Sequence, residues 1–394
     1  MKTFSASAPL ALPGAGRLQS IDALRGLVML FMLLDHVRET FYLHLQVPDP
    51  MVVADTPPGL FFPRMLAHLC APVFVFLTGL GAYLYASRHA DAGQARAAAS
   101  GFLWRRGLFL VLLEVTVVNF AWTFQFPPAK VFLQVIWAIG LSMLALSVLV
   151  FLPRQALLLL GAVLVAGHNL LDGLHFPAGH LLHAPWAILH DRGWLELAGV
   201  QLRTSYPVLP WIGVIALGYG IGPWFGRACA AAQRQHRLLV AGAACLLGFG
   251  VLRTLNVYGD APWQAGAGTL YTVMSWFNVT KYPPSLLFLL LTQGVGLLLL
   301  HAFEARAGRP WLQPLATLGA APMFFYVLHL YVLKFMYLAA VAVWGTNQGQ
   351  LFGLDHLLWL WVLAAVLAVA LYPAVRWFAG LKQRRRDLAW LKYL

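Results

Sequence analysis

The chain has 394 residues, of which 60% are hydrophobic and only 10% charged, and its mean hydropathy is +0.72. A soluble domain of this length needs far more charge to cover its surface, so the composition excludes an ordinary soluble protein and favours a polytopic membrane protein. The net charge of +13 could attract nucleic acid, but Lys and Arg also gather in the cytoplasmic loops of membrane proteins. We therefore expect membrane lipid as a neighbour and no nucleic-acid partner.

Apolar stretches long enough to cross a bilayer follow one another along the chain. A span needs ~20 apolar residues to cross ~30 Å of hydrocarbon, and lipid offers no partner to unpaired backbone groups, so each span should be a helix. We predict an all-α, multi-pass helix bundle of ten or eleven spans in one domain, 1–394, with the bundle over 21–378 and tails over 1–20 and 379–394. The expected spans lie near residues 21–43, 65–86, 107–124, 131–150, 156–171, 206–226, 238–257, 282–301, 315–343 and 357–378.

Basic residues are concentrated on one side of the predicted bundle. Of the 27 Lys and Arg, 19 lie in the N-terminal tail with Arg25, in alternate short loops and in the C-terminal segment from Arg376, which predicts that both termini are cytoplasmic. The opposite loops are long and rich in Pro, Gly, Trp and His, and such loops usually carry binding functions. We therefore expect the functional face on that side, in residues 44–64, 172–205, 258–281 and 344–356.

The first predicted span carries ionisable residues among its leucines, in the stretch IDALRGLVMLFMLLDHVRETFYLH. Arg25 and His36 are eleven residues apart, which is about three helical turns, so they share a face about 16 Å apart. Asp35 lies beside His36, and a carboxylate can orient an imidazole for work as a general base. Arg25, near the cytoplasmic end, could hold a phosphate or could anchor the helix at the interface.

Other polar residues could line a cavity or an acceptor site at the outer side. Some lie within spans, where ionisable groups are costly and usually functional, and others flank the outer loops. Interfacial anchoring, an aromatic belt or a turn would explain several of them equally well. The set consists of Arg64, His68, Tyr206, Asn278, Lys281, Tyr282 and His329. Glu114, in the middle of a span, could pair with a Lys or Arg elsewhere, which the sequence does not identify.

Metal and disulfide chemistry are not expected. The loop HNLLDGLHFPAGHLLHAPWAILHD, residues 168–191, is rich in histidine but contains no HExxH or other closely spaced ligand set, so a polar lid or a packed loop is the expectation. Cys70, Cys229 and Cys245 lie in or beside apolar stretches without a CxxC spacing, which is typical of packing residues.

Several stretches in a fixed order resemble a known family. They are RLQSIDALRGLVMLFMLLDHV followed by PRMLAHLCAPVFVFLTGLGAYLYASR, then SYPVLPWIGVIALGYGIG, LRTLNVYGDAPW, NVTKYPPSLLFLLLTQG and PMFFYVLHLYVL. Together they are similar to bacterial membrane proteins related to the catalytic region of heparan-alpha-glucosaminide N-acetyltransferase. The resemblance implies a helix bundle in the bacterial cytoplasmic membrane. It also implies transfer of an acyl group from cytoplasmic acyl-CoA, typically acetyl-CoA, to an amino or hydroxyl sugar of an extracytoplasmic glycan.

The resemblance also implies roles for individual residues. The Arg25 to His36 spacing is similar to the Arg-x10-His signature of the wider transmembrane acyltransferases, whose histidine is taken as catalytic. By position, His36 becomes the base or a transient acyl carrier, helped by Asp35, and Arg25 helps to hold the donor. In the animal acetyltransferase the matching position looks like Asn and the catalytic histidine lies further on, so His44 stays open as a second candidate.

Two other functions are compatible with the same residues. Intramembrane Asp, His and Glu groups could form the pathway of a transporter or of a proton or solute channel, although no convincing internal repeat supports a transporter built from inverted halves. A scaffold within an envelope-assembly complex is a third reading. A homodimer is left open.

Overall fold

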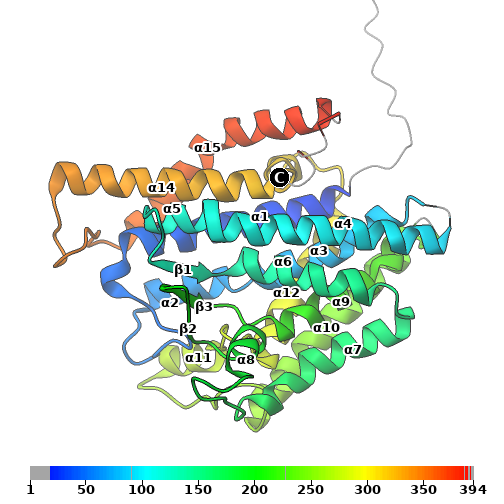
Figure 1. Cartoon of the computed structure of the whole chain (residues 1–394), viewed down its shortest axis with the longest axis horizontal. Helices are drawn as coiled ribbons and strands as arrows, with labels where there is room; N and C mark the ends of the chain where they lie inside the picture. The colour runs from blue at the N-terminus through cyan, green and yellow to red at the C-terminus, as the bar shows by residue number, and fades with distance from the viewer. Residues whose placement is uncertain (1–17, 90, 227, 386, 389–390, 392–394) are drawn as a thin grey trace, which may run out of the picture.

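The structure is a computed structural model that describes residues 18–394 except 90, 227, 386, 389–390 and 392–394. Most of the predicted tail over 1–20 therefore lies outside the described residues. Within them the chain forms mainly long helices, with a small sheet inserted among the loops (Figure 1). In chain order the helices are α1 (Gln19–Phe41), η1 (Leu43–Leu45), α2 (Pro58–Ala67), α3 (Cys70–Ala86), α4 (Ala92–Leu113), η2 (Glu114–Val118), α5 (Asn119–Thr123), α6 (Val135–Leu149), α7 (Arg154–Gly167), η3 (His168–Leu171), α8 (His183–Leu189), α9 (Leu209–Gly220), η4 (Gly222–Phe225), α10 (Ala231–Leu255), α11 (Thr269–Phe277), α12 (Leu286–Ala305), α13 (Leu312–Gly319), α14 (Pro322–Trp344) and α15 (Leu358–Arg384).

Six helices among the described residues are long and apolar enough to cross a membrane. They cover Pro58–Ala86, Arg154–Leu171, Ala231–Leu255, Leu286–Ala305, Pro322–Trp344 and Leu358–Arg384. Helix α6 and the segment Leu209–Phe225 are equally apolar but shorter, and α1 carries several charges. These six helices account for part of the ten expected spans, and the placement of both termini in the cytoplasm stays a prediction.

Helix α1 lies at the centre of the bundle, where α2, α3, α12, α13, α14 and α15 contact it. Its ionisable side chains Asp22, Asp35, His36 and Arg38 are all buried within the protein. An ionisable group in a membrane protein is tolerated when it faces the interior of the bundle and finds partners there. The charges of α1 are therefore consistent with a central helix shielded from lipid.

Glycines allow several helix pairs to approach closely. A Cβ atom on Gly26 of α1 would overlap the carbonyl oxygen of Leu315 in α13, and one on Gly319 of α13 would overlap the carbonyl oxygen of Asp22. The same reciprocal arrangement joins α3 to α9 through Gly79 and Gly218. Small residues at such crossings are typical of membrane helices, which associate by close packing because lipid supplies no hydrophobic drive.

The predicted span over 315–343 is wrong as a single helix, because the chain breaks into α13 and α14 at Ala320 and Ala321. Pro322 begins α14, where its missing N–H costs nothing. The residue before a proline is excluded from the helical region by steric clash, and Ala321 accordingly has φ −135° and ψ 58°.

The bundle also contains a three-stranded sheet, so the all-α description is correct for the bundle and incomplete for its loops. Strands β1 (Lys130–Leu133), β2 (Trp194–Leu197) and β3 (Val200–Thr204) form it in the order β1-β3-β2. β1 pairs with β3 in parallel, and β2 pairs with β3 antiparallel. The predicted span over 131–150 thus begins as a strand, because Gln134 is extended and α6 starts only at Val135.

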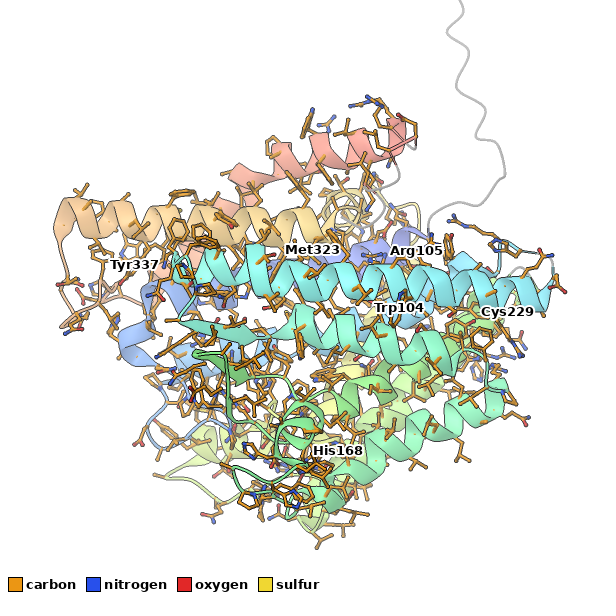
Figure 2. All side chains as sticks on the ribbon, in the orientation of Figure 1. Trp104, Arg105, His168, Cys229, Met323 and Tyr337 are labelled. Atoms are coloured by element: carbon orange, nitrogen blue, oxygen red, sulfur yellow. The ribbon has the colours of Figure 1, made fainter. Side chains whose placement is uncertain are left out.

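The sheet lies at the end of the bundle that also gathers the other long loops, residues 42–57, 124–134, 172–208, 256–285 and 345–357, and we call this the long-loop end. His168, at the end of α7, lies there, whereas Cys229, just before α10, lies at the opposite end (Figure 2). The loops expected to carry function are thus gathered at one end.

Candidate functional site

Two buried histidines from helices far apart in the sequence meet inside the bundle. Nδ1 of His36 on α1 lies 2.7 Å from Nε2 of His329 on α14, and the two rings are stacked with centroids 5.0 Å apart. His329 is fully buried, whereas His36 keeps 9% of its surface accessible. Any substrate that approaches this pair therefore meets His36.

The hydrogen bonds of this His pair fix which ring nitrogen carries a hydrogen. Nδ1 of His329 lies 2.7 Å from the Phe325 carbonyl oxygen, which can only accept, so Nδ1 of His329 is the donor. In a neutral ring the Nε2 of His329 is then an acceptor, and the Nδ1 of His36 donates to it. This arrangement leaves Nε2 of His36 with an unprotonated lone pair, which is the state that a general base requires.

Aromatic side chains enclose the ring of His36. Trp122 at the end of α5 and Tyr326 on α14 approach it edge to face, with centroids 5.3 and 5.9 Å away. Neither the Tyr326 hydroxyl nor the Trp122 Nε1 makes a hydrogen bond of normal geometry among the described residues, although the Trp122 indole N–H approaches the Tyr326 hydroxyl. The O–H of Tyr326 is therefore left to donate to a bound molecule beside His36.

Glu114 is also buried, but its partner is not the Lys or Arg that we expected. Its Oε2 accepts a hydrogen bond from the Trp137 backbone N–H, 3.2 Å away in the first turn of α6. A carboxylate is stabilised there by the unpaired N–H groups of a helix N-terminus. Glu114 is placed by the π-helical turn η2, which shifts the register of the helix.

Asp35 makes no hydrogen bond to His36 among the described residues, because two arginines share its carboxylate, and its help to His36 stays a prediction. Arg38 donates to Oδ1 at 2.9 Å and Arg64 donates to Oδ2 at 2.9 Å. Arg64 also lies 3.5 Å from Glu39, which is partly exposed. Asp35 is therefore the buried counter-ion that joins α1 to α2, and the histidine that contacts His36 is His329.

A loop carboxylate and a lysine extend this charge cluster towards the long-loop end. Asp49 lies 3.8 Å from Arg64 and accepts backbone hydrogen bonds from Lys281 and Tyr282 at 2.9 and 3.2 Å. Burial raises the pKa of the Asp49 carboxyl, and the Arg64 guanidinium and the Lys281 N–H partly oppose that rise. The Lys281 ammonium lies over the Tyr282 ring, 5.1 Å from its centroid.

Two further predicted residues lie in the same region. The hydroxyls of Tyr206 and Tyr282 are hydrogen-bonded at 3.1 Å. His68 is buried against Phe288, and neither of its ring nitrogens finds a hydrogen-bond partner within the described part of the chain. Lys281 lies beside both tyrosines, with its ammonium 5.9 Å from the ring centroid of Tyr206 and 5.1 Å from that of Tyr282. The structure thus brings together most of the predicted cavity residues.

Three predicted residues lie apart from this centre. Asn278 holds the loop before α2, since its side chain exchanges two hydrogen bonds with the backbone of Met51. His44, on η1, stacks on Tyr42 and packs against Gly353 at the long-loop end. Arg25 lies at the opposite end of α1, where it bonds Asp22 at 3.1 Å and the Leu77 carbonyl at 3.3 Å.

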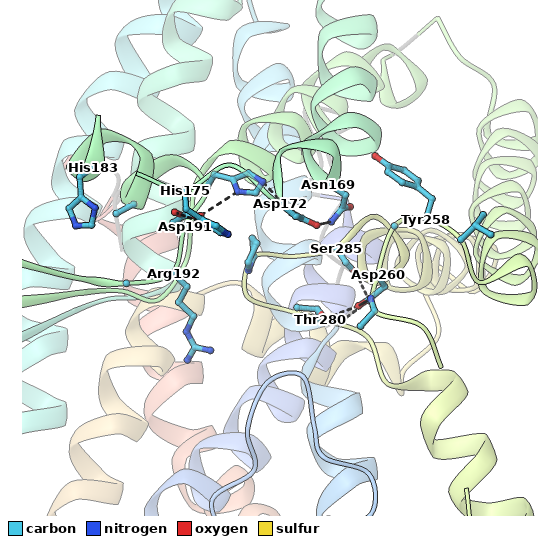
Figure 3. Close-up of a pocket in the computed structure, with 17 residues that line it drawn as sticks. Asn169, Asp172, His175, His183, Asp191, Arg192, Tyr258, Asp260, Thr280 and Ser285 are labelled. Carbon is cyan, nitrogen blue, oxygen red and sulfur yellow. Dashed lines mark hydrogen bonds and ion pairs between the residues drawn. The ribbon is translucent and has the colours of Figure 1, made fainter. Parts of the chain in front are cut away.

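A separate cavity of about 520 Å³ opens at the long-loop end (Figure 3). Loops and helix ends from 169–193 and 257–285 line it. Asp260 organises one wall, because its carboxylate accepts hydrogen bonds from Ala261, Thr280 and Ser285. Ser285 in turn caps the N-terminus of α12 by accepting from the Phe288 N–H. Charged and polar side chains thus form part of the cavity wall, beside apolar ones.

The family model described as heparan-alpha-glucosaminide N-acetyltransferase, catalytic, matches residues 17–259, more than half of the 394-residue chain. The chain belongs to this acetyltransferase family. No curated protein matches the chain. Membership agrees with the resemblance and, with the apolar helices, identifies a membrane transferase. Of the His pair, His36 lies within the matched residues and His329 lies outside them.

The sequence identified most of the site residues, but it did not identify the side chains that contact them. Trp122, Tyr326 and Asp49 carried no recognisable motif, and their roles depend on contacts between distant segments. Tyr326 lies three residues before His329, on the same helix face, so helical spacing from that histidine could have found it. Nothing in the sequence signals Asp49.

Proposed function

We propose that this acetyltransferase-family protein moves an acyl group, most simply acetyl, from cytoplasmic acyl-CoA to an extracytoplasmic amino or hydroxyl sugar. The observation that carries the proposal is the contact of His36 with His329 and of His329 with the Phe325 carbonyl, which in the neutral pair leaves Nε2 of His36 unprotonated. Support for the reaction class comes from the family match. The donor, the acceptor and the sidedness are our inference.

The chemical step uses His36 as the proton acceptor. The nitrogen or oxygen of the acceptor forms a bond to the thioester carbonyl carbon while its proton passes to Nε2 of His36. The C–S bond then breaks, and the imidazolium returns the proton to the departing CoA thiolate. His329 accepts from Nδ1–H of His36 throughout and so keeps Nε2 directed at the substrate.

A second order of events uses the same nitrogen as nucleophile. Nε2 takes the acetyl group and CoA leaves as the thiolate; the acceptor then attacks the acetyl-imidazole and its proton ends on CoA. In either order the O–H of Tyr326, whose oxygen the Trp122 indole N–H approaches, is available to hydrogen-bond the carbonyl oxygen as negative charge develops on it.

The two substrates would reach this centre from opposite ends of α1. Arg25, about 16 Å from His36 along a helix, lies at the end proposed to face the cytoplasm and is 22% exposed, so it can contact a phosphate of the donor. The acceptor would enter from the long-loop end, past Tyr206, Lys281 and Tyr282.

The test measures release of the CoA thiol by purified full-length protein in detergent, with acetyl-CoA and a panel of amino and neutral sugars. His36→Ala should lower kcat at least 10²-fold, and His329→Leu should lower it with little change in KM, because it removes the acceptor that holds the Nδ1–H of His36. His44→Ala is the matched control and should retain activity.

Two outcomes would overturn the proposal. Loss of turnover in His44→Ala with unchanged turnover in His36→Ala would move the base to His44. Solute flux into proteoliposomes without CoA release by any variant would favour the transporter reading. A folded state in each variant is checked by its elution from a size-exclusion column.

A further inference from the structure

Three potential metal ligands come together at the long-loop end, away from the His pair. His168 and Asp172 follow α7 four residues apart, and His190 follows α8. One ligand atom from each residue lies within 4.8 Å of the others. His190 belongs to the same loop but is 22 residues from His168, which explains why the spacing of the sequence did not reveal the set.

His168 is the second, independent indication of a ligand. Its ring is only 2% exposed, and neither nitrogen makes a hydrogen bond of normal geometry with the residues that the structure describes, although the Pro284 carbonyl approaches it. A buried polar group without a partner costs about 1–3 kcal/mol. A metal ion bonded to this ring would remove that cost.

The neighbouring side chains hold the other two residues in place. Asn169 donates to Oδ2 of Asp172 at 2.9 Å and accepts from the Leu286 N–H, which leaves Oδ1 of Asp172 directed at His190. Figure 3 shows Asn169 and Asp172 side by side on the cavity wall. His190 stacks on Trp186 with centroids 5.1 Å apart. Such outer contacts are typical of metal sites.

The Nε2 atom of His190, which faces Asp172, can exchange its present hydrogen bond for a bond to a metal ion. Nε2 lies 3.4 Å from Oδ1 of Asp172 and donates to the His168 carbonyl at 3.0 Å. On metal binding the hydrogen would move to Nδ1, where Oδ1 of Asp191 lies 3.9 Å away. A carboxylate behind a ligating imidazole favours this tautomer.

We propose that His168, Asp172 and His190 form a Zn²⁺ site whose fourth position opens into the 520 Å³ cavity. Two imidazoles and one carboxylate suit zinc, whereas Ca²⁺ and Mg²⁺ prefer oxygen ligands alone. Tetrahedral Zn–N and Zn–O bonds place ligand atoms about 3.4 Å apart, so ligand atoms that lie up to 4.8 Å apart must approach by up to about 1.4 Å. Asp172 and His190 line the cavity, so the open position can take a water or a hydroxyl of a bound molecule.

The site would also add a metal bridge between two segments that His190 already joins through its hydrogen bond to the His168 carbonyl. His168 and Asp172 end the α7 segment, and His190 ends α8, just before β2. Zinc would therefore fix the position of the cavity wall. The inference does not depend on the proposed transfer reaction.

The experiment uses the purified full-length chain, stripped with EDTA and titrated with Zn²⁺ alone against a chromophoric chelator. The wild type should bind one equivalent with a dissociation constant below about 10 µM. Asp172→Asn and His168→Gln should weaken binding at least tenfold, because each removes a ligand. His180→Gln, in the same loop but outside the set, should change the affinity less than twofold.

Cobalt provides the geometric readout. Co²⁺ in the wild type should give the intense visible absorption of a four-coordinate ion, and Asp172→Asn should lose it. Asp172 is 51% exposed, so its substitution should leave the fold intact, which size-exclusion elution checks. Absence of Zn²⁺ uptake by the wild type would overturn the proposal. Equal affinity of wild type and Asp172→Asn would assign the uptake to adventitious surface histidines and would also overturn it.

Discussion

Asp35 compensates two buried guanidinium groups, those of Arg38 and Arg64. Asp35→Asn would leave both positive charges buried with too little negative charge, and breaking a buried ion pair typically costs about 3–5 kcal/mol. We therefore expect a large fall in the apparent melting temperature of the purified protein, measured by intrinsic fluorescence.

Glu39→Gln is the matched control for Asp35→Asn. Glu39 contacts the same two arginines, but its side chain is 36% exposed, and pairs that water can reach contribute ~0–1 kcal/mol. A melting temperature close to the wild type is expected. If Glu39→Gln lowered the melting temperature as much as Asp35→Asn, the stability of the cluster would depend on its total charge. The burial of Asp35 would then not explain its effect.

Asp49 should make stability depend on pH in a defined direction. Burial raises the pKa of its carboxyl, so the native state holds the proton more tightly than the unfolded chain. The stabilising contribution is full below the unfolded pKa of ~3.9 and is lost as the pH rises through the folded value. Asp49→Asn keeps an oxygen for the Lys281 and Tyr282 N–H groups but cannot ionise.

The measurement compares thermal unfolding of wild type and Asp49→Asn from pH ~4 to ~7. The wild type should lose stability relative to the variant as the pH rises, because the Asp49 carboxyl ionises inside the protein and the asparagine side chain cannot. Parallel curves would show that the native environment does not disfavour the charged form.

His36 could be found from sequence, whereas the group that orients it could not. The eleven-residue spacing from Arg25 and the cost of an intramembrane charge singled out His36. Its neighbour Asp35 looked like the orienting group because adjacency is visible in a sequence. The structure gives that role to His329, 293 residues away, and such a contact depends on how α14 packs on α1.

At the scale of elements, the crossing of α1 and α13 should be sensitive to added volume. Gly26→Ala would place a methyl group against the Leu315 carbonyl of the facing helix, and overpacking typically costs about 1–3 kcal/mol. We expect a lower apparent melting temperature and, because α1 carries His36, reduced transfer activity.

Gly250→Ala on α10 is the control for Gly26→Ala, because it changes the helix propensity without adding a packing clash. A Cβ atom there would have nothing within 4 Å, so alanine should be neutral or stabilising by up to about 1 kcal/mol. Equal destabilisation by Gly26→Ala and Gly250→Ala would exclude the close-packing explanation.

Helix boundaries were predictable where a local signal exists. Apolar length located α7, α10, α12 and α15 to within several residues, and Pro322 marked a break that hydropathy alone overlooked. The strand β1 lacked such a signal, because its apolar residues continue into α6 and its partner β3 lies some 70 residues away. Pairing between distant segments is not encoded in local periodicity.

For the whole molecule, the distribution of Lys and Arg predicts that the long-loop end faces away from the cytoplasm. Leu181, 88% exposed at the long-loop end, and Arg309, exposed between α12 and α13, provide reporters for the two ends. In a variant with its three cysteines replaced, a membrane-impermeant maleimide should label Leu181→Cys in intact spheroplasts. Arg309→Cys should react only after permeabilisation.

This orientation matters for the proposed reaction because the two ends of α1 differ in chemistry. Arg25 would then face a cytoplasmic donor, and His36 would lie nearer the acceptor, so one helix would bridge the two compartments. Labelling of Arg309→Cys in intact spheroplasts, with protection of Leu181→Cys, would show that the protein has the opposite orientation in the membrane. The long loops would then meet cytoplasmic molecules, and an acyl-CoA donor would approach His36 from the same end as the acceptor.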